Sequence, residues 1–282
     1  MTRLSVVIPT YDTAAMTLRC CRAVLASMPD CEVIVADDAS RDGTAELLAR
    51  EVPQVRVVRL DENRGFATAA NRGLAESTAD IMLLLNSDAI VEPDALRALL
   101  QAFDADAQLG IAGARLLNAD GSPQWSGGRT PTLPWLIGVV SGLGPLFKRR
   151  KRASASPNMD WVSGAAMAFR RAVWRDTGPL SERFLFYCQD LDFCLRAREN
   201  GWRIALIEAA HVRHDLGATV AHNSPLHHDP ERLWPDLLTW CSSHYGKAWT
   251  KRARPILLLT AALRAVVDHR DPRLQRAWRR LL

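Results

Sequence analysis

The chain has 282 residues, of which 48% are hydrophobic and 24% charged, and its formal net charge is +5. This composition is typical of a soluble globular protein with a sizeable core, and it excludes wholesale disorder. The charge is uneven, because residues 246–282 hold ten Lys or Arg and two acids, while residues 148–152 are all basic. Basic segments of this kind favour an anionic partner, and a solvated basic face is the alternative.

The first half of the chain alternates apolar runs with segments of helical composition. Short apolar runs predict strands at residues 4–8, 32–36, 55–60 and 81–85. Helices are expected at residues 14–28, from Ser40 or Asp42 to 51, at 66–77, and from Pro93 onward. Strands that are apolar throughout are buried on both faces, so this order indicates an α/β protein with a mostly parallel sheet flanked by helices.

The second half is less regular. We expect a helix at residues 191–200 that ends at Gly201, and strands at 161–169, 202–207 and 210–214. After about Gly217 the sequence becomes polar, then helical, basic and rich in Trp, which places a domain boundary there. No run is long enough for a transmembrane helix, and the N-terminus lacks the apolar region of a signal peptide. The scattered cysteines then favour a reducing, cytoplasmic setting.

Polar residues stand where the predicted strands end, which is where ligands bind in sheets of this kind. Asp37 and Asp38 follow the second strand. A carboxylate there can accept hydrogen bonds from a nucleobase or a ribose, or it can cap the next helix. A dinucleotide-binding Rossmann domain is disfavoured, because Pro-Thr-Tyr-Asp at residues 9–12 replaces the Gly-rich turn that such a domain needs after its first strand.

A candidate metal site follows the fourth strand. Asn86, Ser87 and Asp88 stand there, and one carboxylate with diphosphate oxygens is enough to hold Mg²⁺ or Mn²⁺. An ordinary surface turn is the alternative. His214, after a later strand, could complete the metal shell or have a structural role. A zinc finger is disfavoured because the C-x5-C spacing near residue 190 is looser than zinc-finger spacing.

A candidate general base lies at the start of a predicted helix. Residues 184–196 place Asp190 and Asp192 among aromatic and aliphatic side chains. An apolar setting raises the pKa of a carboxyl group toward that of a working base. Attraction to the helix dipole accounts for one acid at this place, but not for two acids in so apolar a segment.

Five segments, in this order, resemble the family 2 glycosyltransferases, and in particular the bacterial rhamnosyltransferase-like branch. They are VVIPTY at 6–11, VADDASRDGT at 35–44, NRGFATAANRG at 63–73, LLLNSD at 83–88 and GPLSERFLFYCQDLDFCLR at 178–196. The resemblance covers roughly residues 4–220. It implies a GT-A domain over residues 1–217, with a nucleotide-sugar half of about 1–118 and an acceptor half of 119–217. A basic, Trp-rich helical extension over 218–282 would follow.

The resemblance implies catalytic roles for three residues. Asp190 would be the general base, and Asp88, as the last acid of the family's DXD motif, would hold Mg²⁺ or Mn²⁺ together with His214. Two positions depart from the family pattern. Asn86 replaces the first acid of the DXD motif and leaves one charge fewer on the metal. Gln189 replaces the acid that usually precedes the base.

The resemblance also implies contacts with the donor substrate. Asp37 would bind the nucleobase, while Arg64 and Asn71 would lie near the diphosphate or the donor sugar. The other residues expected to bind substrate are Pro9, Thr10, Tyr11, Asp38, Asn86, Ser87, Asp192 and Arg196.

The implied function is an inverting, metal-dependent transfer of a sugar from a nucleotide diphosphate donor, with rhamnose as the candidate sugar. The acceptor would be a hydroxyl of a glycan or of a polyprenyl-diphosphate-linked molecule in cell-surface polysaccharide assembly. Apolar and basic segments at 131–152, and at 255–263 followed by 274–282, indicate peripheral contact with an anionic membrane at the inner face of the plasma membrane. A helical subdomain with a solvated face, or a dimer interface, is the alternative.

Other functional classes fit less well. A module that binds sugar nucleotides but has lost activity would explain Gln189 and Asn86. A nucleotidyltransferase would normally carry a Gly-rich loop after the first strand, which is absent here. The basic tail has no recognisable nucleic-acid-binding motif, so no nucleic-acid partner is expected.

Overall fold

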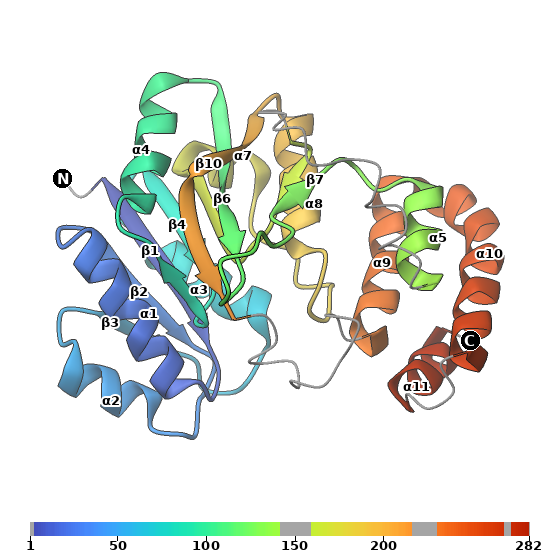
Figure 1. Cartoon of the computed structure of the whole chain (residues 1–282), viewed down its shortest axis with the longest axis horizontal. Helices are drawn as coiled ribbons and strands as arrows, with labels where there is room; N and C mark the ends of the chain where they lie inside the picture. Colours follow the sequence, from blue (N-terminus) through green and yellow to red (C-terminus); the bar gives the residue numbers. More distant parts are fainter. Residues whose placement is uncertain (1–2, 142–158, 216–229, 268–271, 282) are drawn as a thin grey trace. The chain divides into compact units, whose positions relative to one another are not determined.

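A computed structural model of the chain describes residues 3–141, 159–215, 230–267 and 272–281 (Figure 1). The chain divides into two compact units. The first comprises Met1–Arg129, Pro157–Glu182 and Gln189–Thr219, and the second comprises Thr130–Ser156, Arg183–Cys188 and Val220–Leu282. The domain boundary expected near residue 217 falls outside the described residues, so the domain limits stay a prediction.

The first unit is built around an eight-stranded sheet with the order β3-β2-β1-β4-β9-β6-β10-β5 in the described part of the chain. Its core strands are parallel, whereas β9 is antiparallel to β4 and β6, and β5 is antiparallel to β10. In Figure 1 the arrowheads of β1, β6 and β10 point toward the same edge of the sheet. The strands are β1 (Leu4–Thr10), β2 (Glu32–Asp37), β3 (Arg56–Arg59), β4 (Ile81–Leu85), β5 (Ala89–Val91), β6 (Leu109–Leu117), β9 (Ala166–Arg170) and β10 (Arg203–His214).

Helices cover both faces of this sheet, which explains why its strands are apolar throughout. Val6 and Ile8 of β1 belong to the core that packs against α1, α2 and α4. Val7 points to the opposite face, where a Cβ on Gly73 of α3 would lie 2.6 Å from its Cγ1 atom. Only glycine therefore allows α3 to pack this close to the sheet. The helices of this unit are α1 (Ala14–Ser27), α2 (Thr44–Glu51), α3 (Phe66–Glu76), α4 (Ala95–Ala105), α7 (Arg171–Thr177) and α8 (Gln189–Glu199).

The expected α/β fold is confirmed, and three local expectations are wrong. The helix expected from Pro93 begins at Ala95. The strand expected over 161–169 is interrupted, because β8 (Trp161–Val162) pairs with β7 (Gly127–Gly128) and only residues from Ala166 join the main sheet. The two strands expected over 202–214 are a single strand, β10, whose register shifts between Ile207 and His211.

The second unit is helical in its described part. It contains α5 (Leu133–Ser141), α9 (Pro230–His244), α10 (Gly246–Val267) and α11 (Pro272–Leu281). The buried Arg264 of α10 donates from Nη1 to the carbonyl oxygens of Val139 and Val140 at 3.2 and 3.1 Å, which satisfies carbonyls at the end of α5. Among the described residues, no helix is long and apolar enough to cross a membrane.

Candidate functional site

The site forms where β1, β2 and β4 end, because parallel pairing brings these strand ends to one edge. Thr10 pairs with Asp37, and the backbone N–H of Asp38 donates to the carbonyl of Thr10 at 2.9 Å. The hydroxyl of Thr13 donates to that of Ser87 at 3.2 Å and joins the turn after β1 to the turn after β4. The residues expected to bind substrate at these three strand ends are therefore brought together.

Asp37 holds a carboxylate oxygen that no hydrogen-bond donor of the described residues satisfies. The side chain is fully buried, and its Oδ1 accepts from the backbone N–H of Ser40 at 2.9 Å. Its Oδ2 has no hydrogen-bond partner in the described chain, and the Nε atom of Arg59 lies 3.6 Å away. A buried carboxylate oxygen without a donor is costly, so it can accept a hydrogen bond from a ligand once the half-exposed Arg59 moves. Tyr11 is exposed beside the end of β1.

Asp38 and Asn71 are both engaged in the structure of the loops. The carboxylate of Asp38 accepts from the backbone N–H groups of Arg64 and Gly65, each at 2.8 Å, immediately before α3. The amide of Asn71 exchanges two hydrogen bonds with the backbone of Leu180, each at 2.9 Å. The side chain of Arg64 is exposed. The structure thus gives Asp38 and Asn71 positioning contacts, and the substrate contacts of all three residues stay predictions.

The candidate metal ligands meet between β4 and β10. The Nε2 atom of His214 lies 3.3 Å from Oδ1 of Asp88 and 3.1 Å from Nδ2 of Asn86. All three follow from strand pairing, since β10 pairs with β5, which begins directly after Asp88. Asp88 and His214 are buried. The structure therefore brings together the carboxylate and the imidazole that the sequence singled out.

Gln124 orients His214, and no sequence pattern indicates this role. The Nε2 atom of Gln124 donates to the carbonyl oxygen of His214, which can only accept a hydrogen bond. The Oε1 atom of Gln124 therefore faces the Nδ1 atom of the His214 ring, 3.1 Å away. A carbonyl oxygen needs a donor, which assigns the proton of the neutral imidazole to Nδ1. The Nε2 atom is then left as an acceptor, 3.1 Å from Nδ2 of Asn86 and 3.3 Å from Oδ1 of Asp88. Such an outer hydrogen bond commonly fixes the orientation of a metal-binding histidine.

These residues fit a hard divalent cation that is also bound by substrate. Across the described ranges, no group of three or more His, Cys, Asp or Glu is placed to hold a metal. Mg²⁺ and Mn²⁺ do not need such a group, because they bind through one or two protein ligands plus substrate phosphates. Asp88 and His214, whose Oδ1 and Nε2 atoms lie 3.3 Å apart, are two candidate ligands of this kind.

The candidate base lies in the first turn of α8. The Oδ2 atom of Asp190 accepts from the backbone N–H of Gly164 at 2.9 Å, and its Oδ1 accepts from the N–H of Leu191 at 2.8 Å. Burial raises the pKa of the Asp190 carboxyl group above its ordinary value, and these hydrogen bonds oppose the shift. A raised pKa brings a carboxylate closer to the range in which it removes protons effectively.

One turn connects the candidate base to the candidate metal ligands. Gly164 and Ala165 lie in the turn that precedes β9, and the backbone N–H of Asn86 donates to the carbonyl of Ala165 at 3.0 Å. The antiparallel pairing of β4 with β9 fixes this contact. Hence Asp190, about a hundred residues from Asn86 in the sequence, is held against the same edge of the sheet.

The buried Asp192 and the partly exposed Arg196 form a structural pair. The Nε atom of Arg196 donates to Oδ2 of Asp192 at 2.8 Å, and the guanidinium also donates to the carbonyl oxygens of Thr177 and Pro179 at 2.6 and 2.9 Å. This network fixes the turn before residue 180. The binding of substrate by Asp192 and Arg196 stays a prediction.

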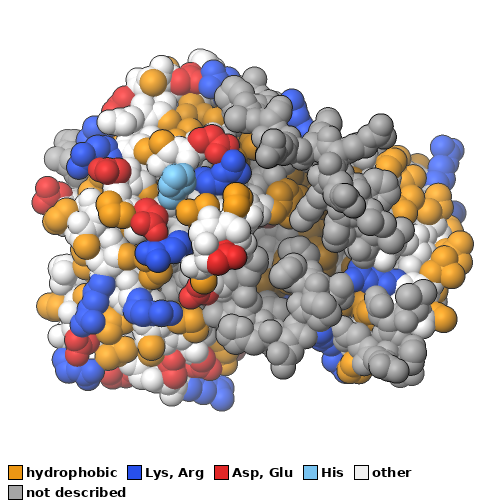
Figure 2. All heavy atoms as spheres, in the orientation of Figure 1, with side chains coloured by type: hydrophobic (Ala, Val, Ile, Leu, Met, Phe, Trp, Pro, Cys, Tyr) orange, Lys and Arg blue, Asp and Glu red, His pale blue; other side chains and the backbone are white. Residues whose placement is uncertain are grey.

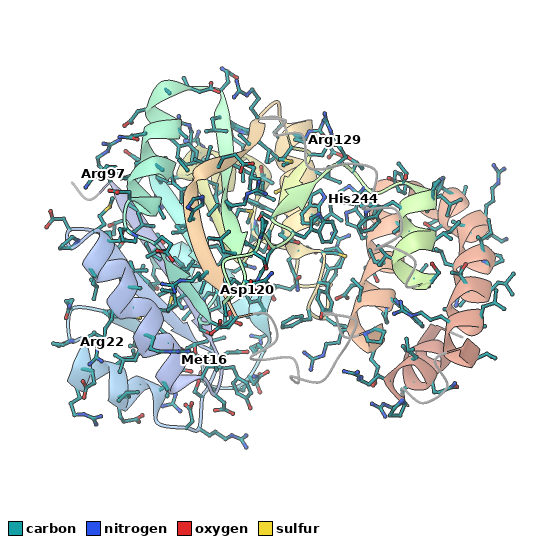
Figure 3. All side chains as sticks on the ribbon, viewed as in Figure 1. Met16, Arg22, Arg97, Asp120, Arg129 and His244 are labelled. Atoms are coloured by element: carbon teal, nitrogen blue, oxygen red, sulfur yellow. The ribbon has the colours of Figure 1, made fainter. Side chains whose placement is uncertain are left out.

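The sequence missed Gln124 and Gly164 because both act through contacts that are distant in the chain. In Figure 3 the labelled Asp120 lies in the turn that follows β6, near the edge to which β6 and β10 point. Gln124 follows this turn, and its backbone N–H donates to Leu116 at 2.8 Å. No periodic pattern marks such a position.

The fold is of the GT-A type. The fold matches that of mannosyltransferase PcManGT from Pyrobaculum calidifontis, solved with GDP-Man and Mn²⁺, with a TM-score of 0.59 and 18% identity over 93% of this chain and 75% of that chain. It also matches S. aureus TarS, with a TM-score of 0.58 and 16% identity over 99% of this chain and 90% of that one. The likeness to these two proteins is one of fold.

The sequence comparison adds the family. The profile of glycosyl transferase family 2 matches residues 5–178, and the chain belongs to that family. A similar protein is the N-acetylglucosaminyl-diphospho-decaprenol L-rhamnosyltransferase of Mycobacterium tuberculosis (strain ATCC 25618 / H37Rv), 28% identical over 72% of this chain and 74% of that protein. The succinoglycan biosynthesis protein ExoO of Rhizobium meliloti (strain 1021) is 35% identical over 41% of this chain and 34% of its own length. The expected family and fold are confirmed.

Proposed function

We propose that this glycosyltransferase is inverting and metal-dependent, and that it transfers a sugar from a nucleoside diphosphate donor to the hydroxyl of a polyprenyl-diphosphate-linked acceptor. One observation carries the proposal: strand pairing gathers Asp88, His214 and Asp190 at one edge of the sheet. A metal-binding pair and a carboxylate with a raised pKa are the two elements that a single displacement requires.

The reaction follows from the positions of these side chains. Asp190 accepts the proton of the acceptor hydroxyl as that oxygen attacks the anomeric carbon of the donor. The bond from the anomeric carbon to the phosphate oxygen breaks in the same step, so the configuration inverts and no enzyme nucleophile is used. Mg²⁺ or Mn²⁺ held by Asp88 and His214 would neutralise the charge that develops on the departing nucleoside diphosphate.

The donor nucleotide would lie along the ends of β1 and β2. The unsatisfied Oδ2 of Asp37 supports hydrogen bonding to a nucleobase N–H, and the exposed ring of Tyr11 offers a surface for stacking. Arg64, exposed at the start of α3, has the charge that a diphosphate requires. We propose these three contacts between the protein and the donor nucleotide.

The choice of sugar and acceptor rests on one relative. The mycobacterial protein is named as a rhamnosyltransferase that acts on N-acetylglucosaminyl-diphospho-decaprenol. By that likeness we take a rhamnose nucleotide as the first donor to test and a polyprenyl diphosphate sugar as the first acceptor. The role would be in cell-surface polysaccharide assembly, at the cytoplasmic side of the plasma membrane. Such an acceptor would require peripheral contact with the membrane.

A binding module without activity is the second candidate, and Gln189 is the observation that favours it. This residue stands where the family usually has an acid, and it is buried with no hydrogen-bond partner for its Nε2 atom in the described residues. Asp190 nevertheless keeps both of its backbone contacts, which favours activity.

A donor screen tests the proposal. The purified chain is mixed with Mg²⁺ or Mn²⁺ and a panel of nucleotide sugars, and thermal stability and release of nucleoside diphosphate are measured. We expect one donor to stabilise the protein and to be turned over with metal, and Asp190→Asn to abolish turnover while donor binding persists. Binding without turnover, even with lipid-linked acceptors, would favour the inactive module. No binding of any nucleotide sugar would refute both candidates.

A further inference from the structure

In the described part of the second unit, one face of α10 exposes large apolar side chains. The helix turns its small side chains inward, because Ala253, Ala261 and Ala265 are 3%, 0% and 1% exposed. Leu257 is buried with them at 3%, but Leu259 and Leu263 are 62% and 59% exposed. A helix that only had to pack on its own unit would not leave two leucines this exposed.

The exposed residues form one continuous stripe. Ile256, Leu259, Leu263 and Val266 follow one another at intervals of three, four and three residues, which places them on one side of the helix. At 1.5 Å per residue the stripe is about 15 Å long. Figure 2 shows hydrophobic side chains at the outer margin of the helical unit. A contiguous apolar patch of this kind marks a surface that contacts another apolar phase.

The charge on α10 indicates which apolar phase this is. The helix contains no Asp or Glu, and its first half carries exposed cations. Arg252 is exposed one turn before Ile256 on the side of the stripe, whereas Lys247, Lys251 and Arg254 line a hollow about 130° around the helix from it. An anionic surface attracts all four cations across the width of one helix. A second copy of α10 would bring no negative charge to these cations.

We propose that α10 lies on an anionic lipid surface. The apolar stripe enters the boundary between headgroups and acyl chains with Arg252 beside it, and the positive charge of Lys247, Lys251 and Arg254, farther around the helix, attracts the anionic surface. This inference deepens the proposed function, because it names the surface by which the enzyme reaches a lipid-linked acceptor.

Flotation of the full chain with vesicles tests the proposal. The probes are vesicles of phosphatidylcholine alone and vesicles with about one third phosphatidylglycerol. We expect binding to the anionic vesicles that weakens as salt is raised. The double variant Leu259→Glu/Leu263→Glu should lower this binding by about tenfold or more. The matched control is Ala26→Glu/Ala49→Glu, which adds the same charge at exposed alanines of α1 and α2 and should bind nearly as the wild type.

Three results would overturn the proposal. The first is the absence of binding to anionic vesicles, and the second is equal loss of binding in the double variant and the control. The third is a wild-type dimer that Leu259→Glu/Leu263→Glu dissociates, which would make the stripe an interface between copies. Lys251→Ala/Arg254→Ala is a second, milder variant, and it should reduce binding while leaving the apolar stripe intact.

The proposed function can fail separately. On a water-soluble acceptor of short chain length, the α10 variant should keep wild-type turnover, whereas on the same glycan lipid embedded in vesicles its turnover should fall in proportion to binding. Vesicle binding without turnover on either acceptor would refute the transferase assignment and leave the lipid surface standing. Turnover on both acceptors that the variant does not alter would refute the role of α10 alone.

Discussion

Gln124→Leu tests whether the orientation of His214 determines metal binding. Leucine has a similar volume, so the change removes the amide without opening a large cavity. It deletes the acceptor that faces Nδ1 of His214 at 3.1 Å and the donor to the carbonyl of the same residue. The neutral imidazole can then carry its proton on either nitrogen, and the ring is no longer held with Nε2 beside Asn86 and Asp88.

The expected effect can be estimated from comparable hydrogen bonds. Loss of the partner that orients a metal-bound histidine weakens metal binding by about 10- to 100-fold, which is about 1.4 to 2.7 kcal/mol. The carbonyl of the buried His214 also loses its donor, so the variant should lose about 1 to 3 kcal/mol of folding stability. Mn²⁺ affinity is therefore measured by paramagnetic resonance, with and without UDP, at a temperature well below the unfolding midpoint.

The control is Gln101→Leu, since Gln101 is exposed on α4. It should leave the Mn²⁺ affinity unchanged. If Gln124→Leu folds and binds Mn²⁺ as tightly as the wild type does, Gln124 does not orient a metal ligand. If His214→Ala also leaves the affinity unchanged, His214 is not a ligand and the reasoning fails one step earlier.

Three further predictions concern the candidate base, the binding of the nucleotide and the close contact between Gly164 and Asp190. Burial raises the pKa of Asp190, and a base works only when it is deprotonated. We therefore expect kcat/KM to rise with pH through a midpoint above the ordinary aspartate pKa of about 3.9. A midpoint at or below that value would contradict the assignment. Asp37→Asn should weaken binding of nucleoside diphosphates by about 1.5 to 3 kcal/mol in calorimetry, because it removes the carboxylate charge and replaces one of the two acceptor oxygens by an NH2 group. A Cβ on Gly164 would lie 3.3 Å from the Cβ of Asp190. Gly164→Ala should therefore displace the Asp190 side chain and lower kcat about tenfold while donor binding is kept. An unchanged kcat would show that transfer tolerates this displacement.

The sequence predicted the sheet well where burial alone determines it. Runs such as Ile81–Leu85 are apolar on both faces, and this property needs no knowledge of partners. The interruption at residues 163–165 was missed because Ser, Gly and Ala there continue a small and apolar run. What ends the run is the contact of Gly164 with Asp190, which lies 26 residues later. The sequence predicts two strands at 202–207 and 210–214, whereas the structure has the single strand β10, whose register shifts between Ile207 and His211.

The placement of candidate residues was predictable where residue type and position at the end of an element agree, since Asp88 follows β4 and Asp190 lies at the start of α8; their roles stay predictions. It was not predictable where the same residue types hold the backbone. Asp38 accepts from backbone N–H groups 26 and 27 residues away, and Arg196 donates to carbonyls 19 and 17 residues away. A sequence pattern identifies a carboxylate or a guanidinium but does not say which backbone group meets it. Gln124, whose partner lies 90 residues away, has no local signal at all.

The arrangement of the site separates what is rigid from what can vary. Asp190 is fixed by the N–H of Gly164, and the turn that contains Gly164 is fixed to Asn86 through Ala165. The base and the candidate metal ligands thus depend on the same pairing of β4 with β9, and no single loop can shift one against the other. Differences in donor or acceptor must therefore arise from side chains outside this pairing, of which Tyr11 and Arg64 are exposed. Exchanging these two residues should change substrate preference, whereas disturbing the β4–β9 pairing should abolish transfer for every substrate.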